Sequence, residues 1–339
     1  MDKIVDRTHI SFAANDRSYF ALLKKEIQKI AEEAGIPKNR LNELEIIVSE
    51  ITSNLSKYAK DGEILVGVFG KGKDSYIEII SLDNGPGMAN TSKMLQDGVT
   101  TGTTLGHGLG SIKRLSDTFD IYSQVGWGTI LLSRIYVAKP QLAKKDPFIV
   151  RPLVLAKPGE TISGDGFMCK VTARGFQVLL ADGLGHGPAA NEAVNAAVKA
   201  LISEPLALPS ETLRVLHPAI KKTRGAVAHI LNYEHKEKKW ICCGIGNIML
   251  RLYGPHLHKN HMSYNGIVGH NIPNTLNDQY YTSLDFNTAV ICSDGIKTRW
   301  DLAKYPQILN HDPSILAAAV YKDHGRKTDD MSVIVIKIK

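Results

Sequence analysis

Apolar residues recur at every third or fourth position near the start of the chain, which is the spacing of one face of a helix. Two such stripes are present. The first consists of Tyr19, Leu22, Leu23, Ile27 and Ile30, and the second of Leu41, Leu44, Val48, Ile51 and Leu55. Gly35 lies between them and is expected to end the first helix. The pattern therefore predicts two amphipathic helices in succession.

Short apolar runs typical of strands dominate the rest of the chain. In the first half they cover residues 63–69, 76–80, 119–123 and 129–136, and a short helix is expected at 109–115. In the second half they cover residues 148–155, 167–172, 176–180, 226–231, 240–243, 248–252, 289–292 and 332–338, with helices at 189–202 and 313–321. The pattern predicts an α+β protein with sheets in both halves.

A segment without periodicity separates the two halves. Residues 138–146 contain Lys139, Pro140, Lys144 and Lys145 and no apolar repeat, as is typical of a linker. A chain of 339 residues is also more often two domains than one. We therefore predict a domain at residues 1–137, a linker at 138–147 and a second domain at 148–339.

Composition narrows the class of protein. The chain is 43% hydrophobic and 22% charged, as globular proteins are. It has no run of about 18 apolar residues and no signal-peptide core at its polar start, so we expect a cytoplasmic protein without a membrane span. The four cysteines fall mostly in apolar runs and lack zinc-type spacing, so we interpret them as reduced core residues. They are Cys169, Cys242, Cys243 and Cys292.

The formal net charge is +7, which is one signature of nucleic-acid binding. The lysines, however, are scattered, without a long basic tract or interleaved aromatic residues. No nucleic-acid partner is therefore expected. A basic surface suits an acidic or phosphorylated protein partner instead.

Aspartates stand at the ends of apolar runs in the second half. Asp182 and Asp294 are each followed by Gly, Asp329 adjoins the last run, and Asp165 lies in Ser163-Gly164-Asp165-Gly166. Carboxylates gathered at strand ends suit hard divalent cations. Two such ions about 3.5–4 Å apart can activate a water and hold a phosphoryl group. A single Asp-Gly pair marks only a turn, but the ordered set favours a metal site.

Three stretches in the first half favour a nucleotide site. Glu50 and Asn54 are four residues apart and share a helix face, although an ordinary solvated face would look the same. Asp83-Asn84-Gly85-Pro86-Gly87-Met88 follows a predicted strand, and Gly106-His107-Gly108-Leu109-Gly110 precedes a predicted helix. Glycine-rich backbone at a helix N-terminus can hold phosphate groups.

In this order, the three stretches resemble the GHKL ATPases over about residues 17–136, and the compact form is most similar to the anti-sigma serine kinases of the RsbT-like branch. The resemblance implies a Bergerat α/β sandwich that binds ATP or ADP with Mg²⁺. Asn54 would hold the Mg²⁺, Glu50 would orient or deprotonate the attacking hydroxyl, and Asp83 would bind the adenine amino group. The backbone positions expected to approach the nucleotide are Gly85 and Gly87 at the base, and Gly106, His107, Gly108, Leu109 and Gly110 at the phosphates.

The aspartate motifs resemble the metal-dependent PPM serine/threonine phosphatases, in the SpoIIE/RsbX-like branch, over about residues 148–339. The resemblance implies an α-β-β-α sandwich that holds two Mn²⁺ or Mg²⁺ ions. Asp182 would bridge both ions and the Gly183 carbonyl would support one of them. Asp165 would serve the second ion, and Asp294 and Asp329 would complete the first. Asp182 and Asp294 are the expected catalytic residues.

Three other assignments stay open from the resemblance. Asp330 stands where related phosphatases often carry Asn, so it is expected to support the metal ligands from outside. His186 could help a proton reach the leaving serine oxygen, or cap a turn. Eukaryotic relatives grip phosphate with an arginine that has no clear counterpart here. The candidates are Arg151, Arg174 and Arg224, the last within Thr223-Arg224-Gly225-Ala226-Val227.

Together, the resemblances imply a bifunctional switch regulator that phosphorylates and dephosphorylates Ser/Thr of STAS-type partners, in the stressosome or among anti-anti-sigma proteins. A sigma factor or a downstream phosphatase is a further candidate partner, and the chain could form a homodimer. No membrane partner is expected. Two alternatives remain: a phosphatase whose first half only senses nucleotide, and an anti-sigma-type module that sequesters its partner. We further hypothesise that the linker near Pro140 couples the halves.

Overall fold

The structure, a computed structural model, describes residues 3–5, 9–95, 108–140 and 147–339. The chain divides into two compact units. The N-terminal unit comprises His9–Lys145 and Leu302–Ala319, and the C-terminal unit comprises Met1–Thr8, Asp146–Asp301 and Val320–Lys339. Each unit therefore includes a piece of chain from the other end of the sequence. The sequence had predicted two contiguous domains. It therefore placed Met1–Thr8 in the first domain and Leu302–Ala319 in the second, the reverse of this division.

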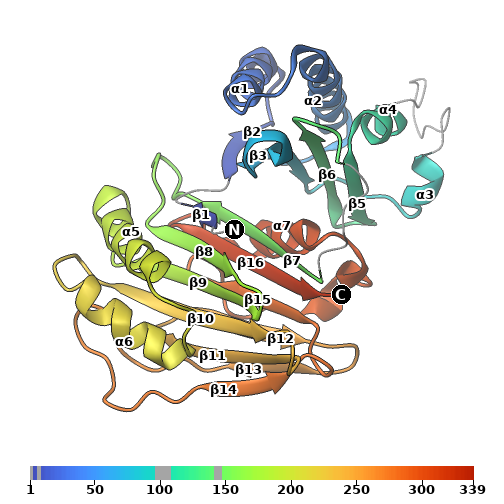
Figure 1. Ribbon diagram of the computed structural model, residues 1–339. Helices are drawn as coiled ribbons and strands as arrows, with labels where there is room; N and C mark the ends of the chain where they lie inside the picture. Colours follow the sequence, from blue (N-terminus) through green and yellow to red (C-terminus); the bar gives the residue numbers. More distant parts are fainter. Residues whose placement is uncertain (1–2, 6–8, 96–107, 141–146) are drawn as a thin grey trace. The chain divides into compact units, whose positions relative to one another are not determined.

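The N-terminal unit is a five-stranded antiparallel sheet with helices on one face (Figure 1). The strand order is β2-β3-β4-β6-β5. The strands are β2 His9–Ala13, β3 Glu63–Phe69, β4 Tyr76–Asp83, β5 Thr118–Gln124 and β6 Gly128–Tyr136. The helices are α1 Phe20–Glu33, α2 Lys38–Tyr58, α3 Thr91–Met94 and α4 Gly108–Leu115, with 3-10 turns at Arg17–Tyr19 and Gly72–Asp74. The elements predicted from periodicity in this half are confirmed.

Helices α1 and α2 pack on the sheet largely through the predicted faces. The buried residues are Leu23, Ile27 and Ala31 of α1 and Leu44, Ile47, Val48, Ile51 and Leu55 of α2. The predicted stripe of α1 was wrong at its start, because Tyr19 and Leu22 are 61% and 55% exposed. Tyr19 lies in the 3-10 turn before α1. Leu22 points away because successive helical residues diverge by about 100°, and Leu23 takes the core position.

The opposite face of this sheet buries a charged pair. Glu78 of β4 and Arg134 of β6 are cross-strand partners, and each is 1% exposed. Arg134 donates hydrogen bonds both to Glu78 and to Asp312, which lies in the segment Leu302–Ala319. Asp120 of β5 accepts a hydrogen bond from the Asp312 backbone N–H at 2.7 Å. These bonds attach the segment to the sheet, so it belongs to the N-terminal unit.

The C-terminal unit is a sandwich of two antiparallel sheets with helices outside (Figure 1). One sheet has the order β1-β8-β9-β10-β11-β14 and the other β13-β12-β15-β16-β7. The first contains β1 Lys3–Val5, β8 Asp165–Val171, β9 Gly175–Gly183, β10 Ala226–Glu234, β11 Lys239–Ile245 and β14 Gln279–Thr282. The second contains β7 Phe148–Leu155, β12 Met249–Tyr253, β13 His258–His261, β15 Thr288–Cys292 and β16 Met331–Ile338.

Helices α5 Pro188–Ser203 and α6 Pro209–Ala219 cover the outer face of the six-stranded sheet. Helix α7 Pro313–His324 begins in the segment that belongs to the N-terminal unit and ends in the C-terminal unit. Two 3-10 turns, Leu302–Lys304 and Ile308–Asn310, precede it. Among the helices that the structure describes, none is both long and apolar enough to cross a membrane.

Successive side chains of a strand point to opposite faces of the sheet, so the six-stranded sheet contacts two separate cores. On β11, Cys242 faces the core between the sheets, whereas Cys243 faces the core beneath α5 and α6. All four cysteines are free and buried, which confirms their interpretation as core residues. Periodicity missed β1, β2, α3, α6, β13 and β14. A strand as short as β1 or as exposed as β13 carries little hydrophobic pattern.

Candidate active sites

The first candidate site lies where α2 meets the start of α4. Glu50 and Asn54 are half-buried on α2. A Cβ atom at Gly108 would lie 2.7 Å from Glu50 Oε2 and 3.7 Å from Asn54 Oδ1. The structure thus brings the predicted acidic and amide side chains against the backbone at the start of α4. A side chain there would displace the Glu50 carboxylate.

The turn after β4 packs against the end of α2. The Asp83 Oδ1 atom accepts a hydrogen bond from the Gly85 backbone N–H at 2.7 Å. A Cβ atom at Gly85 would lie 2.5 Å from the Tyr58 carbonyl oxygen, one helical turn beyond Asn54. Gly87 has φ +68°, a conformation that L side chains rarely adopt. The turn therefore lies close to the face of α2 that carries Glu50 and Asn54.

The second glycine-rich stretch is described only in part. Gly106 and His107 lie outside the described residues. Leu109 is partly buried against the hydrophobic core, and Gly110 is buried in α4. Gly108 is therefore the member of this stretch that the structure places beside the predicted site residues.

The second candidate site lies at one end of the sandwich. Asp165, the first residue of β8, is the cross-strand partner of Asp182 near the end of β9. Asp294 follows β15 and Asp329 precedes β16. These two strands are neighbours in the five-stranded sheet. A hydrogen bond of 2.6 Å from Ser332 Oγ of β16 to Asp165 Oδ2 joins the two sheets at this point. Aspartates from both sheets therefore meet at one end.

Electrostatics shows how closely the carboxylates are gathered. Burial raises the pKa of Asp182 well above its usual range. The carboxylates whose negative charges add to this rise are Asp165, Asp294, Asp329 and Asp330. Burial also raises the pKa of Asp165 to about 7, and the charges of Asp330 and Asp294 contribute. Such a cluster is unfavourable without a compensating cation.

The residues present fit a divalent metal centre. Asp165 Oδ1 is buried and has no hydrogen-bond partner among the described residues. An oxygen without a donor, in a group made of carboxylates, is the environment that Mg²⁺ and Mn²⁺ prefer. The structure thus brings Asp165, Asp182, Asp294 and Asp329 to the same end of the sandwich, where their charges act on one another. Their assignment as metal ligands stays a prediction.

Two residues adjoin the cluster in other ways. Asp330 is buried and uses both carboxylate oxygens to accept backbone hydrogen bonds, from Lys157 and Gly164, each at 2.8 Å. Asn247 Nδ2 donates to Asp294 Oδ2 at 2.8 Å. The sequence had not singled out Asn247 or Ser332 as site residues. The sequence feature that could have pointed to Asn247 as a site residue is its position in the motif Gly244-Ile245-Gly246-Asn247.

The loop between Asp182 and α5 shapes the edge of this site. A Cβ atom at Gly183 would lie 2.2 Å from the Ala190 carbonyl oxygen, so the loop packs tightly on α5. His186 Nδ1 lies 2.9 Å from Glu160 Oε1, and both side chains are accessible to solvent. A Cβ atom at Gly185 would lie 3.0 Å from Arg224 Nη1. Arg224 therefore lies against the aspartate loop.

The other two candidate arginines lie farther away. Arg174 is in the turn between β8 and β9, at the opposite end of these strands from Asp165 and Asp182. Arg151 is four residues along β7 from Leu155, roughly 13 Å at the usual rise of a strand. Leu155 pairs with Met331, next to Asp330. Of the three arginines, Arg224 has the position to meet a ligand at the cluster.

Comparison with known proteins assigns the N-terminal unit. Residues 12–134 match the histidine kinase-like ATPase domain family. The serine/threonine-protein kinase RsbT of Bacillus subtilis (strain 168) is 35% identical over 103 residues, which is 30% of this chain and 77% of RsbT. In its N-terminal unit, the chain belongs to the RsbT family. The GHKL-type ATPase fold predicted from the three motifs is thereby confirmed.

The C-terminal unit has the fold of PPM phosphatases. The phosphoserine phosphatase RsbX of Bacillus subtilis (strain 168) is 34% identical over 102 residues, 30% of this chain, and the match spans 51% of RsbX. A crystal structure of RsbX with magnesium aligns with a TM-score of 0.50 at 21% identity, covering 59% of this chain and 99% of that chain.

A chain from work on the bacterial stressosome, described as a modular system adapted to control secondary messenger signaling, aligns with a TM-score of 0.51 at 25% identity. The alignment covers 56% of this chain and 99% of that chain. One polypeptide thus joins a unit of the RsbT family to a unit with the fold of RsbX.

Proposed function

We propose that this chain is a two-way switch acting on serine or threonine residues of STAS-domain proteins. The N-terminal unit phosphorylates the residue with ATP, and the C-terminal unit removes the phosphate. One observation carries the proposal: a single chain contains two different acidic sites. Glu50 and Asn54 lie in the GHKL-type fold, and the aspartate cluster lies in the PPM-type fold. Likeness to a kinase and to a phosphoserine phosphatase supports the same conclusion.

In the kinase reaction, the chain acts mainly by positioning. Mg²⁺-ATP, when bound, supplies the phosphoryl group and neutralises charge as it transfers. Asn54 contributes an amide oxygen toward the ion, and Asp83 accepts a hydrogen bond from the adenine amino group. Glu50 lies within contact distance of the α4 start, where it orients the substrate hydroxyl and accepts its proton.

For the phosphatase reaction, four aspartates would hold two Mn²⁺ or Mg²⁺ ions, which when bound would supply Lewis acidity and an activated water. The ligands are Asp165, Asp182, Asp294 and Asp329, with the Gly183 carbonyl in support. Asn247 orients Asp294 through the 2.8 Å hydrogen bond. Asp330 holds the backbone of Lys157 and Gly164 around the ligands rather than binding an ion.

Arg224 is proposed to hold the substrate phosphate. It is exposed, and its guanidinium lies against Gly185 in the loop that follows Asp182. The loop is tied to the Arg224 turn by a hydrogen bond from the Leu184 N–H to the Gly225 carbonyl at 3.1 Å. A guanidinium fork binds two phosphate oxygens at once, so it can orient a phosphoserine beside the ions.

The deciding experiment uses γ-labelled ATP, candidate STAS proteins and an Asp294→Ala chain, which should not erase its own product. Label should appear on a STAS protein and disappear when Glu50→Ala is added. The labelled protein should then lose its phosphate to the wild-type chain with Mn²⁺, but not to Asp294→Ala. ATP binding without transfer to any STAS protein would refute the kinase half.

A second candidate function is a phosphatase controlled by nucleotide binding. One observation favours it: the segment Leu302–Ala319, which follows Asp294 and precedes Asp329 in sequence, is part of the N-terminal unit. A change in that unit on binding ATP or ADP therefore has a covalent path to two metal-ligand positions. This path is a second route for coupling beside the linker near Pro140, and it is compatible with an active kinase.

A further inference from the structure

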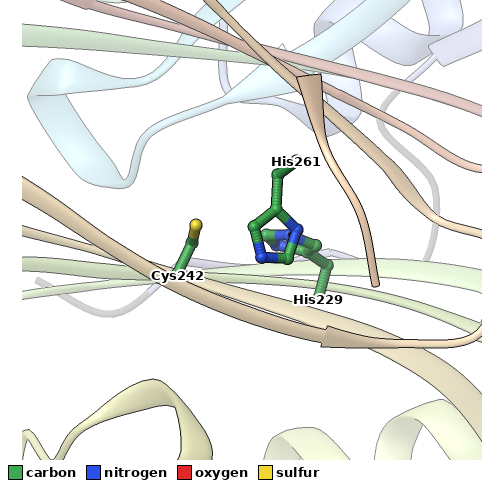
Figure 2. Close-up of side chains that lie close together, drawn as sticks. All are labelled: His229, Cys242 and His261. Carbon is green, nitrogen blue, oxygen red and sulfur yellow. The ribbon is translucent and has the colours of Figure 1, made fainter. Parts of the chain in front are cut away.

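Two histidines and a cysteine meet in the interior of the C-terminal unit. His229 of β10 and Cys242 of β11 come from the six-stranded sheet, and His261 at the end of β13 comes from the other sheet (Figure 2). All three are buried, and one potential ligand atom from each lies within 4.8 Å of the others. The group is separate in sequence from every aspartate of the candidate phosphatase site.

The two imidazoles lack enough hydrogen-bond partners for their burial. His229 Nε2 lies 3.2 Å from His261 Nδ1. The outer nitrogens, His229 Nδ1 and His261 Nε2, are buried and have no partner within the described part of the chain. In the absence of an ion, one ring donates its N–H to the other, so the facing nitrogens are the atoms that an ion would bind.

The surroundings keep all three side chains neutral. Burial lowers the pKa of His229 well below its usual range, and the neighbouring His261 adds to the effect. Burial likewise lowers the pKa of His261 to about 4. Burial raises the pKa of the Cys242 thiol well above its usual value, with Cys243 contributing. Neutral imidazoles are the form that binds metal ions, and a bound cation would favour the Cys242 thiolate.

The spacing also fits a metal ion. Two nitrogens bound tetrahedrally at about 2.0–2.1 Å from zinc lie about 3.3 Å apart, close to the 3.2 Å between the facing imidazole nitrogens. Imidazole and thiolate are ligands for zinc-type transition metals, whereas Mg²⁺ and Mn²⁺ prefer carboxylate oxygens. The chemistry of this group therefore differs from that of the aspartate cluster.

We propose that His229, Cys242 and His261 form a structural site for a zinc-type transition metal. The ion joins the two sheets, because it takes two ligands from β10 and β11 and one from the short edge strand β13. This role is independent of the proposed kinase and phosphatase reactions. Its effect is to hold β13, most of whose side chains are exposed, onto the sandwich.

Cobalt substitution provides the test, since a cobalt–thiolate bond gives a charge-transfer absorption that carboxylate ligands cannot produce. The full-length Asp294→Asn chain is stripped of metal, unfolded, and refolded with Co²⁺ or Zn²⁺, so that a buried site can fill. We expect one tightly held ion per chain, the thiolate band with Co²⁺, and a higher melting temperature with Zn²⁺ than without it. A refolded chain without the thiolate band would overturn the proposal.

Two cysteine variants separate this site from other thiols. Cys242→Ala should lose the thiolate band and the tightly held ion. Cys243→Ala, its neighbour on the opposite face of β11, should keep both. Equal bands in the two variants would also overturn the proposal. If Cys242→Ala fails to refold, His261→Gln on the edge strand takes its place, with the same loss of the tightly held ion expected.

Discussion

Arg134 donates two hydrogen bonds to the carboxylate of Asp312, from Nη1 to Oδ2 at 2.7 Å and from Nη2 to Oδ1 at 2.8 Å. The two residues are 178 positions apart. Arg134 belongs to the central sheet of the N-terminal unit, and Asp312 belongs to a segment inserted between β15 and β16. This bidentate pair fixes the segment on the sheet of the RsbT-like unit.

Removal of the Asp312 carboxylate should destabilise the N-terminal unit. Asp312→Ala leaves the fully buried Arg134 with Glu78 as its remaining charged partner. Breaking a buried ion pair costs about 3–5 kcal/mol, and we expect the lower end because Glu78 still offsets the charge. Urea unfolding measures the loss. The matched control is Glu237→Ala, whose exposed pair with Lys239 should contribute little to stability, because solvent screens it.

The same substitution should uncouple the phosphatase from nucleotide. If Leu302–Ala319 carries the signal, ATP or ADP changes the wild-type rate of phosphoserine hydrolysis but leaves the rate of Asp312→Ala unchanged. The measurement is phosphate release from a phosphorylated STAS protein with Mn²⁺, with and without nucleotide. An unchanged nucleotide response in Asp312→Ala, under conditions where the variant is folded, would show that coupling takes another route.

Asn247→Ala should weaken metal binding at the aspartate cluster. The variant removes the hydrogen bond that orients Asp294, and loss of such an outer partner typically lowers metal affinity or activity roughly 10–100-fold. The Mn²⁺ concentration needed for half-maximal phosphatase activity should rise accordingly. The control is Asn277→Ala, at an exposed position, which should leave this Mn²⁺ concentration unchanged. Equal metal dependence in both variants would remove Asn247 from the site.

Arg224→Ala should raise the KM for a phosphorylated protein and leave the Mn²⁺ requirement unchanged, since Arg224 lies against the loop at Gly185 and is not one of the proposed ligands. Arg224→Lys retains the charge but not the bidentate fork, so it should recover activity only in part. Arg174→Ala, in the turn at the far end of β8 and β9, is the control. Equal effects of Arg224→Ala and Arg174→Ala would count against the phosphate-binding role.

Without metal, the C-terminal unit should lose stability as pH rises. Burial and neighbouring charges raise the pKa of Asp165 from 3.8 to about 7, so the folded chain binds more protons than the unfolded chain between these values. The stabilisation is complete below pH 3.8 and is lost as pH rises through about 7. Melting temperatures across this range should fall less steeply in Asp165→Asn, and Mn²⁺ should raise them most near neutral pH. A wild-type profile that is parallel to that of Asp165→Asn would contradict this account.

Local pattern was sufficient for most helices and strands, whereas the roles of the site residues stay predictions. A helix face repeats every three to four residues, so the stripe ending in Leu55 correctly predicted α2 and placed Glu50 and Asn54 on a shared face. Strand ends are marked by turn residues, so Asp165 and Asp182 were each predicted beside the end of an apolar run. Both inferences depend only on geometry within a few residues of each position.

Contacts between distant segments depended on the tertiary structure. Nothing near Asp312 indicates that it pairs with Arg134, because that contact depends on how a sheet face is covered. Cys242 lacks zinc-type spacing in sequence, yet the stacking of two sheets brings it to His229 and His261. Asp329 and Asp330 are adjacent, yet only Asp330 turns both oxygens to backbone N–H groups. Local periodicity decides which face a residue occupies, whereas packing between elements decides what that face meets.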